Sequence, residues 1–459
     1  MEHATIAAIA TAMSPSGISI IRISGPDAFR IIDEIYRSPD PEKKLSKQPS
    51  HTVHYGWIRE QEQTIDEVMV LLMRAPHSYT TEDTVEIDCH GGMLVTKRIL
   101  ETVLCHGAVL AAPGEFTKRA FLNGRIDLSR AEAVMDLIEA ENQYAAESAI
   151  QQLRGSVAQK IGAYRDVLLD EMAFLESALD DPEHFELDGF GSRLAETLQR
   201  MQADMQTLLE TSENGRVLTE GIRTVILGRP NAGKSSLLNQ LSGAERAIVT
   251  EIEGTTRDLL EEKVQLGQIT FLLTDTAGLR ESDNVVEQIG ISRAVEASRQ
   301  ADLLLYVIDS SSPFVPLDEK TEQLFREKCT VLIRNKTDLQ ELVKEEDLQK
   351  RYPDLPICSI SAKDGAGLDQ LEQLLKELFF QGKVDLNEQI LLSNLRQKEA
   401  LRDAANSLAM VQRSIEDGMP EDFYSADLMD AYTSLGKIIG ASVEEDLVDR
   451  IFEKFCMGK

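Results

Sequence analysis

The spacing of apolar and polar residues predicts an N-terminal domain that mixes strands and helices over residues 1–120. Apolar runs at 17–24, 68–73 and 84–88 are typical of β-strands. After Gly91 and Gly92, the stretch through Leu104 has the apolar periodicity of a helix. Together these elements predict an α+β domain with a core of its own.

A second pattern, of long helices, begins after this domain. Apolar residues recur at spacings of three and four over 161–179 and again over 194–208, and Pro182 should end the first of these helices. The helical pattern returns in residues 383–459, which are acidic and too few to bury a substantial core alone. We therefore expect this part to pack against a helical domain at 121–215, although the two parts could also be separate.

Between the two helical parts, residues 216–382 alternate strands with helices, which predicts a parallel sheet. The segment 228–235, GRPNAGKS, follows an apolar strand and precedes a helix that starts at Ser236. Its glycines let backbone N–H groups turn toward a β-phosphate, and the helix N-terminus favours negative charge. Lys234 is expected to bridge the β- and γ-phosphates, and Ser235 to ligate Mg²⁺. This segment therefore predicts a P-loop, and a plain glycine-rich turn is the less specific alternative.

Later motifs predict that the nucleotide is a guanine nucleotide. Asp275-Thr276-Ala277-Gly278 follows a strand, where the carboxylate can hold the Mg²⁺ shell through water. Asn335-Lys336-Thr337-Asp338 follows another strand, and Asp338 can accept two hydrogen bonds that guanine donates and adenine does not. Ser361-Ala362-Lys363 fits the last loop that contacts the base. The order of these motifs predicts binding of GTP and GDP and excludes an ATPase.

The loop at 250–258 should close over the γ-phosphate, with Thr256 completing the Mg²⁺ shell beside Ser235. Leu279 stands where many GTPases place a glutamine that orients the attacking water, so another residue must take this role. The predicted nucleotide contacts are Asn231, Ala232, Gly233, Lys234, Ser235, Ser236, Thr250, Glu251, Ile252, Glu253, Gly254, Thr255, Thr256, Asp275, Thr276, Ala277, Gly278, Asn335, Lys336, Asp338, Ser361, Ala362 and Lys363.

The predicted fold is therefore multidomain α/β plus α: an N-terminal α+β domain, a central helical domain and an inserted Ras-like P-loop GTPase domain with a mostly parallel sheet. The expected limits are 1–120, 121–215, 216–382 and 383–459, the last two being the GTPase domain and the second part of the helical domain.

Composition indicates which partners and which cellular compartment to expect for this protein. The formal net charge of −30 argues against unaided adhesion to nucleic acid or anionic membranes, so a partner should supply much of any RNA contact. The five cysteines form no CxxC pair, no apolar run is long enough for a membrane span, and no secretory signal opens the chain. We expect a reduced, cytoplasmic protein without membrane contact.

Longer runs of sequence resemble one family. GRPNAGKSS, GTTRD, DTAGLR and a terminal FCMGK, together with GISIIRISG and PGEFTKRAFLNGR (113–125), are similar to the MnmE (TrmE) tRNA-modification GTPases over essentially the whole chain. The resemblance implies a folate-binding N-terminal domain through which the chain forms a homodimer. It also implies a flavoprotein partner, MnmG (GidA), and addition of a carboxymethylaminomethyl or aminomethyl group at C5 of the tRNA wobble uridine. A tetrahydrofolate derivative, in its 5-formyl or methylene form, would supply the one-carbon unit.

The resemblance also implies roles for particular residues. Glu287 would orient the attacking water, which covers for Leu279, and Cys456 would act in tRNA modification in a redox, nucleophilic or structural role. Arg125 departs from the family lysine, keeping the positive charge with a different hydrogen-bond geometry. The implied K⁺ ligands are Asn231, Thr250, Ile252 and Thr255, and the implied folate-binding residues are Arg22, Glu86, Arg125 and Lys459.

Two alternatives to this function stay open. The first is a ribosome-assembly or translation GTPase that acts as a switch without base chemistry; an added RNA-binding domain would favour it, and we recognise none. The second is a folate-dependent one-carbon enzyme in which GTP only regulates. Co-purification with a flavoprotein or with ribosomal particles would distinguish the main prediction from the first alternative, and formyl-group turnover without any partner would support the second.

Overall fold

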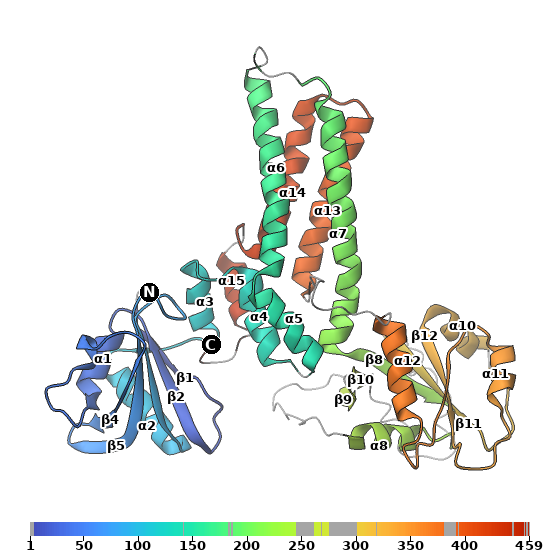
Figure 1. Ribbon diagram of the computed structural model, residues 1–459, viewed down its shortest axis with the longest axis horizontal. Coiled ribbons are helices and arrows are strands. Elements are labelled where there is room, and N and C mark those ends of the chain that lie inside the picture. Colours follow the sequence, from blue (N-terminus) through green and yellow to red (C-terminus); the bar gives the residue numbers. More distant parts are fainter. Residues whose placement is uncertain are drawn as a thin grey trace. The chain divides into compact units, whose positions relative to one another are not determined.

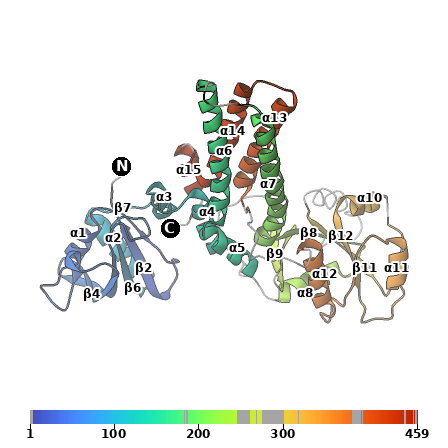
Figure 2. The same cartoon turned by 45° about the horizontal axis from the view of Figure 1, so that its top comes forward.

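Figures 1 and 2 show the computed structural model of the chain. It divides into two compact units. Unit 1 comprises residues 1–138, 152–202 and 399–459, and unit 2 comprises residues 139–151 and 203–398. The residues that the structure describes are 4–140, 142–181, 184, 187–244, 261–267, 269–274, 301–317, 319–380, 392, 394–442, 445–453, 455 and 458.

The N-terminal part of unit 1 is built on a seven-stranded sheet in the order β3-β4-β5-β6-β2-β1-β7. Its neighbours are antiparallel except for the parallel pair β1 and β7. The strands are β1 (Ile6–Ile9), β2 (Ser16–Ser24), β3 (Tyr36–Arg37), β4 (Thr52–Glu60), β5 (Gln63–Met73), β6 (Thr84–Gly91) and β7 (Val109–Leu110). Strands β2 and β6 confirm the predictions at 17–24 and 84–88. Strand β5 begins five residues before the predicted 68, and the apolar pattern missed these residues because most of them are polar.

Helices α1 (Ala28–Ile35) and α2 (Met93–Cys105) bury their apolar faces in the core of this sheet. Ile31, Ile32 and Ile99 are fully buried there, beside Val70 and Ile87 of the strands. A short 3₁₀ turn at Leu45–Lys47 contacts α1, and α3 (Glu115–Leu122) follows the sheet. Helix α2 thus confirms the helix predicted after Gly92 and through Leu104, and the α+β character of the domain follows from this packing.

Long helices make up the rest of unit 1. In this unit α14 packs along α6, and Gln202 of α7 donates a hydrogen bond to the carbonyl oxygen of Ala405 in α13 (Figure 1). Helix α6 ends at Asp180, directly before the break expected at Pro182. The helices that contribute residues to this unit are α4 (Leu128–Ile138), α6 (Ser156–Asp180), α7 (Phe190–Glu220), α13 (Leu395–Glu416), α14 (Tyr424–Ile439) and α15 (Glu445–Phe452), with a 3₁₀ turn at Glu421–Phe423. Residues 203–220 of α7 and 395–398 of α13 belong to unit 2.

Unit 2 contains a six-stranded sheet in the order β13-β12-β11-β8-β10-β9, parallel except at the β9 edge. This arrangement confirms the mostly parallel sheet. The strands are β8 (Ile222–Gly228), β9 (Glu261–Leu266), β10 (Ile269–Thr274), β11 (Leu303–Asp309), β12 (Cys329–Asn335) and β13 (Ile357–Ser359). The helices are α5 (Gln143–Leu153), α8 (Lys234–Ala244), α10 (Glu319–Glu327), α11 (Glu345–Arg351) and α12 (Leu368–Phe380).

The boundary between the helical part and the α/β part differs from the expected one in two places. Helix α7 continues through Glu220, past the expected limit at 216, before β8 begins. Most of helix α5 clusters with unit 2 although its residues lie within the expected helical domain. The contact is specific: Asn142 Nδ2 donates a hydrogen bond to Thr270 Oγ1 at 3.3 Å, and both residues are buried. Among the described helices, none is long and apolar enough to cross a membrane.

Candidate nucleotide-binding site

The loop between β8 and α8 needs glycine at two positions. Gly228 has a φ of 145° and Gly233 a φ of 98°. A Cβ atom on Gly228 would lie 2.4 Å from the carbonyl oxygen of Val307, and one on Gly233 would lie 2.1 Å from Asn335 Nδ2. The loop can pass this close to β11 and β12 only because these residues have no side chain. Its backbone therefore remains free to surround a phosphate, as a P-loop requires.

Lys234 begins α8 and folds back over this loop. Its Nζ donates hydrogen bonds to the carbonyl oxygens of Gly228 and Arg229, each at 2.8 Å. Burial lowers the pKa of the Lys234 amine from its ordinary value. Ser235 and Ser236 are exposed in the first turn of α8, where helix N–H groups favour an anion. The predicted phosphate-binding residues thus meet at one helix N-terminus.

Asn335 joins two of the predicted nucleotide loops. Its Nδ2 donates to the carbonyl oxygen of Ala232 at 2.9 Å, and its Oδ1 accepts from the backbone N–H of Ala362 at 3.0 Å. The residue is only 1% exposed, so these bonds form in a site largely closed to water. One amide therefore fixes the P-loop against the 361–363 loop, which gives Asn335 a structural role besides the predicted nucleotide contact.

Asp338 lies at the surface of the same edge of the sheet. Ser361 Oγ donates a hydrogen bond to Asp338 Oδ1 at 3.0 Å, which orients the carboxylate. The backbone of Ser361 is in turn bridged to Ala366. The structure thus brings together the two motifs that were expected to contact the base.

Asp309, which the sequence analysis did not select, belongs to this group. It ends β11 opposite Asn335, and its Oδ2 lies 2.7 Å from Lys336 Nζ. Burial works to raise the pKa of Asp309, but hydrogen bonds from Lys336 and Ser311 outweigh it, and the net pKa lies below its ordinary value. A signal was present: an acid at the end of a strand that neighbours the strand of the base-recognition motif.

The predicted folate-binding residues lie in unit 1, where Arg22 of β2 and Glu86 of β6 are register partners. Arg22 Nε and Glu86 Oε1 are 2.7 Å apart, and each side chain is 15% exposed. Arg22 Nη1 also donates to the carbonyl oxygen of Gly458 at 3.0 Å, so the end of the chain reaches this pair. Arg125 Nη1 donates to the carbonyl oxygen of Tyr79 at 2.7 Å.

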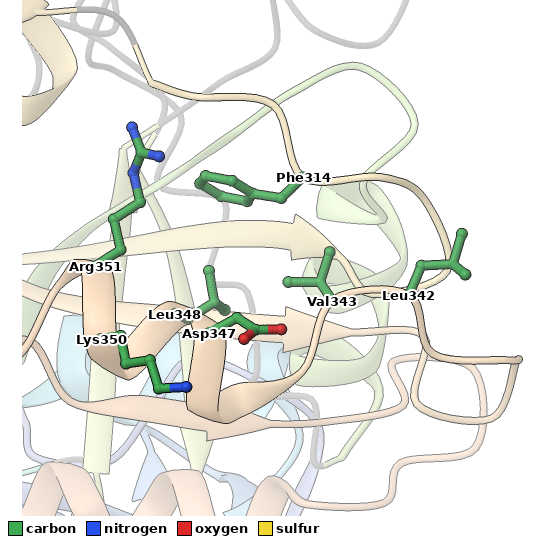
Figure 3. Close-up of a pocket in the computed structure, with 7 residues that line it drawn as sticks. All are labelled: Phe314, Leu342, Val343, Asp347, Leu348, Lys350 and Arg351. Carbon is green, nitrogen blue, oxygen red and sulfur yellow. The ribbon is translucent and has the colours of Figure 1, made fainter.

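Cavities open on the surface of each unit among the described residues. One, of about 630 Å³, is in unit 1 and is lined by His51, Met73, Pro76, His77, Ser78, Tyr79, Thr81, Asn123, Gly124 and Arg125, so it includes one predicted folate-binding residue. Another, of about 410 Å³, is in unit 2 and is lined by Phe314, Leu342, Val343, Asp347, Leu348, Lys350 and Arg351 (Figure 3). None of the predicted site residues lines the second cavity.

Comparison with known proteins decides the family. A model described as the GTP-binding protein TrmE N-terminus matches residues 5–125, and one described as the MnmE helical domain matches residues 128–456. The tRNA modification GTPase MnmE of Lachnoclostridium phytofermentans is 52% identical over 459 residues, which is 100% of both chains. Its namesake in Listeria welshimeri is 44% identical over 460 residues, again 100% of both. The chain belongs to the MnmE family of tRNA modification GTPases.

Solved structures add little to this MnmE assignment. Era from Aquifex aeolicus, bound to GDP and AlF₄⁻, is 27% identical; the match covers 40% of this chain and 66% of that one, with a TM-score of 0.27. The G domain of FeoB from T. maritima is 25% identical, over 34% of this chain and 97% of that one, with a TM-score of 0.25. At such scores the fold rests on the sheet order and the loops described above.

Several residues that the MnmE resemblance implicates lie outside the described residues. They include the loop at 250–258, the segment 275–278, Glu287, Cys456 and Lys459. Of the predicted cation ligands, Asn231 and Ser235 are described, and Asn231 has a φ of 62° in the P-loop. Within the described part of the chain, no cluster of three or more His, Cys, Asp or Glu side chains could hold a metal ion. The predicted cation ligands are of a different kind, being hydroxyl, amide and backbone oxygens.

Proposed function

We propose that the chain hydrolyses GTP with K⁺ stimulation and, with the flavoprotein MnmG (GidA), adds a carboxymethylaminomethyl or aminomethyl group at C5 of the tRNA wobble uridine. The observation that carries the nucleotide half is the Asn335 amide, which joins the P-loop to the 361–363 loop while Ser361 holds Asp338. Full-length relatives named as tRNA modification GTPases support the other half.

The P-loop fits a nucleoside triphosphate with two cations. Its glycine backbone leaves room beside β11 and β12, and Lys234 supplies positive charge at the helix N-terminus. We assign Mg²⁺ to Ser235 and Thr256, with the Asp275 carboxylate acting through water. K⁺ is assigned to oxygens of Asn231, Thr250, Ile252 and Thr255. When bound, the cations neutralise the negative charge that develops on the phosphates during hydrolysis.

Two acidic residues take different parts in this proposal. Asp338 accepts the two guanine N–H groups and so selects GTP over ATP, because adenine would leave its carboxylate without donors. Glu287 orients the attacking water in place of Leu279, whose side chain cannot hydrogen-bond. The first role is supported by the Ser361–Asp338 hydrogen bond, and the second by the family resemblance.

The N-terminal residues fit a folate of the 5-formyl or methylene tetrahydrofolate type, whose contribution when bound is a one-carbon unit. Arg22 engages one oxygen of Glu86, and a carboxylate has a second oxygen that suits paired N–H donors such as those of a pterin. Arg125 borders the cavity of about 630 Å³ and offers a cation to an acidic tail. We add Lys459 to this site and place the modification chemistry at Cys456.

The proposal includes two kinds of macromolecular contact. A second copy of the chain would bind through the N-terminal domain to form a homodimer. Transfer RNA would be held largely by MnmG, because a chain with a formal net charge of −30 repels a polyanion over most of its surface.

A nucleotide swap tests both halves at once. The full chain, MnmG, unmodified tRNA, a one-carbon folate and the remaining substrates are combined with GTP or XTP, and wobble nucleosides are measured by mass spectrometry. The parent should modify tRNA with GTP. Asp338→Asn should fail with GTP and recover with XTP, because its amide then faces the ring carbonyl of xanthine. A loss of about 10–100-fold in GTP affinity corresponds to one charged hydrogen-bond pair.

The matched control is Asp364→Asn, which removes a neighbouring carboxylate that also lies within reach of Ser361 Oγ. This variant should keep its preference for GTP. Modification that proceeds without any nucleotide would contradict the coupling. A parent protein that hydrolyses GTP yet gives no modified nucleoside with MnmG would favour a translation switch.

A further inference from the structure

The side chain of Asp309 is held by hydrogen bonds from Ser311 in addition to its contact with Lys336. The backbone N–H of Ser311 donates to Asp309 Oδ1 at 2.9 Å, and the Ser311 hydroxyl donates to the same oxygen at 2.6 Å. Oδ2 accepts from the ammonium of Lys336 at 2.7 Å and, at the longer distance of 3.3 Å, from the Ser312 hydroxyl. The side chains of Asp309 and Lys336 are 18% and 30% exposed, so water screens their attraction less than it would on the open surface.

Lys336 has a backbone conformation that a lysine disfavours. Its φ of 65° lies in the left-handed region, where a Cβ atom is crowded by the neighbouring carbonyl. Lys336 also stands between the two base-recognition side chains, Asn335 before it and Asp338 two residues later. The contact with Asp309 ties down the far end of the side chain and so helps to hold this turn of the motif.

The backbone of Ser310, the residue after Asp309, is held independently of the contact between Asp309 and Lys336. Ser310 N–H donates to the Asn335 carbonyl oxygen at 3.0 Å, and the N–H groups of Leu342 and Val343 both donate to the Ser310 carbonyl oxygen. A change confined to the Asp309 carboxylate therefore leaves the main-chain contacts between β11 and the recognition loop in place. The side-chain contribution can be measured by itself.

We infer that Asp309 is a positioning residue for guanine-nucleotide binding, acting through Lys336. With its amine held by Asp309, the extended methylene stem of Lys336 lies at a fixed place beside Asn335 and Asp338. That stem is apolar and suits the flat face of a purine base. Without the carboxylate, the ammonium would be drawn into water and the stem would have no fixed place. The inference rests on the proposed binding of GTP and GDP at this site.

A double-mutant cycle on the full chain separates this role from a merely structural one. The dissociation constant of a fluorescent GDP would be measured with Mg²⁺ for the parent, Asp309→Asn, Lys336→Met and the double variant. Asparagine keeps an oxygen for Ser311 but turns an amide toward Lys336. We expect Asp309→Asn to weaken GDP binding roughly 5- to 30-fold, which is the lower range for a charged hydrogen bond because the pair is partly exposed.

In the Lys336→Met background the same change should weaken binding less than about twofold, because there is no ammonium left to position. Asp309→Glu should restore part of the affinity in the parent background. The KM for GTP should rise in Asp309→Asn by about the same factor as the dissociation constant of GDP, since the effect is on binding.

The matched control is Glu341→Gln, which removes the carboxylate of the other ion pair on this loop. Glu341 Oε2 lies 3.0 Å from Arg334 Nη1, and the pair does not include Lys336. GDP affinity in this variant should stay within about threefold of the parent, as for a partly exposed pair away from the ligand. Equal losses for Asp309→Asn in both backgrounds, or an equal loss in Glu341→Gln, would overturn the inference. If the parent failed to bind GDP, the proposed function would fail as well.

Discussion

The carboxyl ends of the parallel strands of unit 2, where Asp309, Asn335 and Lys336 lie, are called the nucleotide edge. This edge and the Arg22–Glu86 pair of unit 1 are both polar clusters of a sheet, but they are assembled differently. In unit 2 the contacting residues follow the ends of parallel strands, so that Asn335 reaches Ala362 and Lys336 reaches Asp309 across 27 positions each. In unit 1 the pair spans 64 positions between antiparallel strands, and Arg22 meets Gly458 across 436. A parallel sheet collects its loops at one edge, whereas the second cluster depends on register and on the far end of the chain.

This difference sets how each cluster should respond to mutation. At the nucleotide edge, Asn335 forms neutral hydrogen bonds through an amide that is almost fully buried, and their loss leaves backbone groups without partners. The unit 1 pair is held by opposite charges that retain some contact with water. Removing the side chain should therefore lower folding stability more at Asn335 than at Glu86, and the two losses of stability should differ in their sensitivity to salt.

The largest effect is expected for Asn335→Ala. The carbonyl oxygen of Ala232 and the N–H of Ala362 would both lose their partner, and each unsatisfied buried group costs about 1–3 kcal/mol. Unit 2 should lose about 2–4 kcal/mol of stability, and GDP affinity should fall roughly 100-fold because two nucleotide loops are no longer joined. Hydrogen exchange of the β8 and β12 amides and a GDP titration would measure the two losses.

Asn142→Ala provides the control for this prediction. Asn142 is also a buried amide in unit 2, but it bonds to Thr270 Oγ1 and the N–H of Ala145, outside the nucleotide loops. This variant should lose stability while keeping GDP affinity close to that of the parent. If both variants lost affinity equally, the effect at Asn335 would reflect general loosening of the unit, and the comparison would fail.

The effect at the unit 1 pair should be intermediate. Glu86→Gln keeps an oxygen for Arg22 Nε but removes the negative charge, and with both side chains 15% exposed the loss should be about 1–2 kcal/mol, between a surface and a buried pair. Trp57, the one tryptophan of the chain, lies in β4 of the same sheet, so its fluorescence during urea unfolding reports this unit.

Glu34→Gln is the matched control, because Glu34 pairs with Arg30 on α1 with side chains 45% and 48% exposed. The stability lost in Glu34→Gln should be much smaller than that lost in Glu86→Gln and should vanish in high salt, whereas most of the Glu86 loss should persist. Equal losses in the two variants would mean that the Arg22–Glu86 pair is no better shielded from water than a surface pair.

Sequence alone predicts much more of the nucleotide edge than of the unit 1 cluster. The P-loop and the Asn335–Asp338 motif are each a continuous run of sequence. Each was predicted to follow a strand because a short apolar run precedes it, and the structure confirms these strands as β8 and β12. Asp309 was missed because a single acid after a strand is common and its partner lies on another strand. Arg22 and Glu86 were selected only through the family resemblance, since strand register cannot be read from either strand by itself.

The limits of the α/β part were hard to predict for a related reason. The apolar periodicity of α7 fades after residue 208, yet the helix continues to Glu220 because packing can support turns whose own sequence is polar. The predicted division also leaves α5 with the helical domain. Just before α5, Asn142 donates a buried hydrogen bond to Thr270, and Tyr144 of α5 packs against the core of the unit 2 sheet. Contacts of this kind have no periodicity to detect.

The smallest effect should be found at a pair of the N-terminal sheet in which one partner, a histidine, is largely exposed to water. His90 at the end of β6 has a side chain that is 71% exposed, and its Nδ1 lies 2.7 Å from Asp66 Oδ1. The hydrogen bond to Asp66 and its charge raise the pKa of His90 above the ordinary value. A raised pKa in the folded state means that the stabilisation is present below the unfolded pKa and is lost as pH rises through the folded pKa.

An NMR titration of the His90 ring in the parent and in Asp66→Asn measures this directly. The pKa of His90 should be lower in the variant, and the difference should shrink as salt is added, because the ring lies in water. Glu34→Gln serves as the control and should leave the His90 titration unchanged. The same His90 pKa in the parent and in Asp66→Asn would show that an exposed pair in this sheet has no measurable coupling, and the graded series from Asn335 through Glu86 to His90 would then end at Glu86.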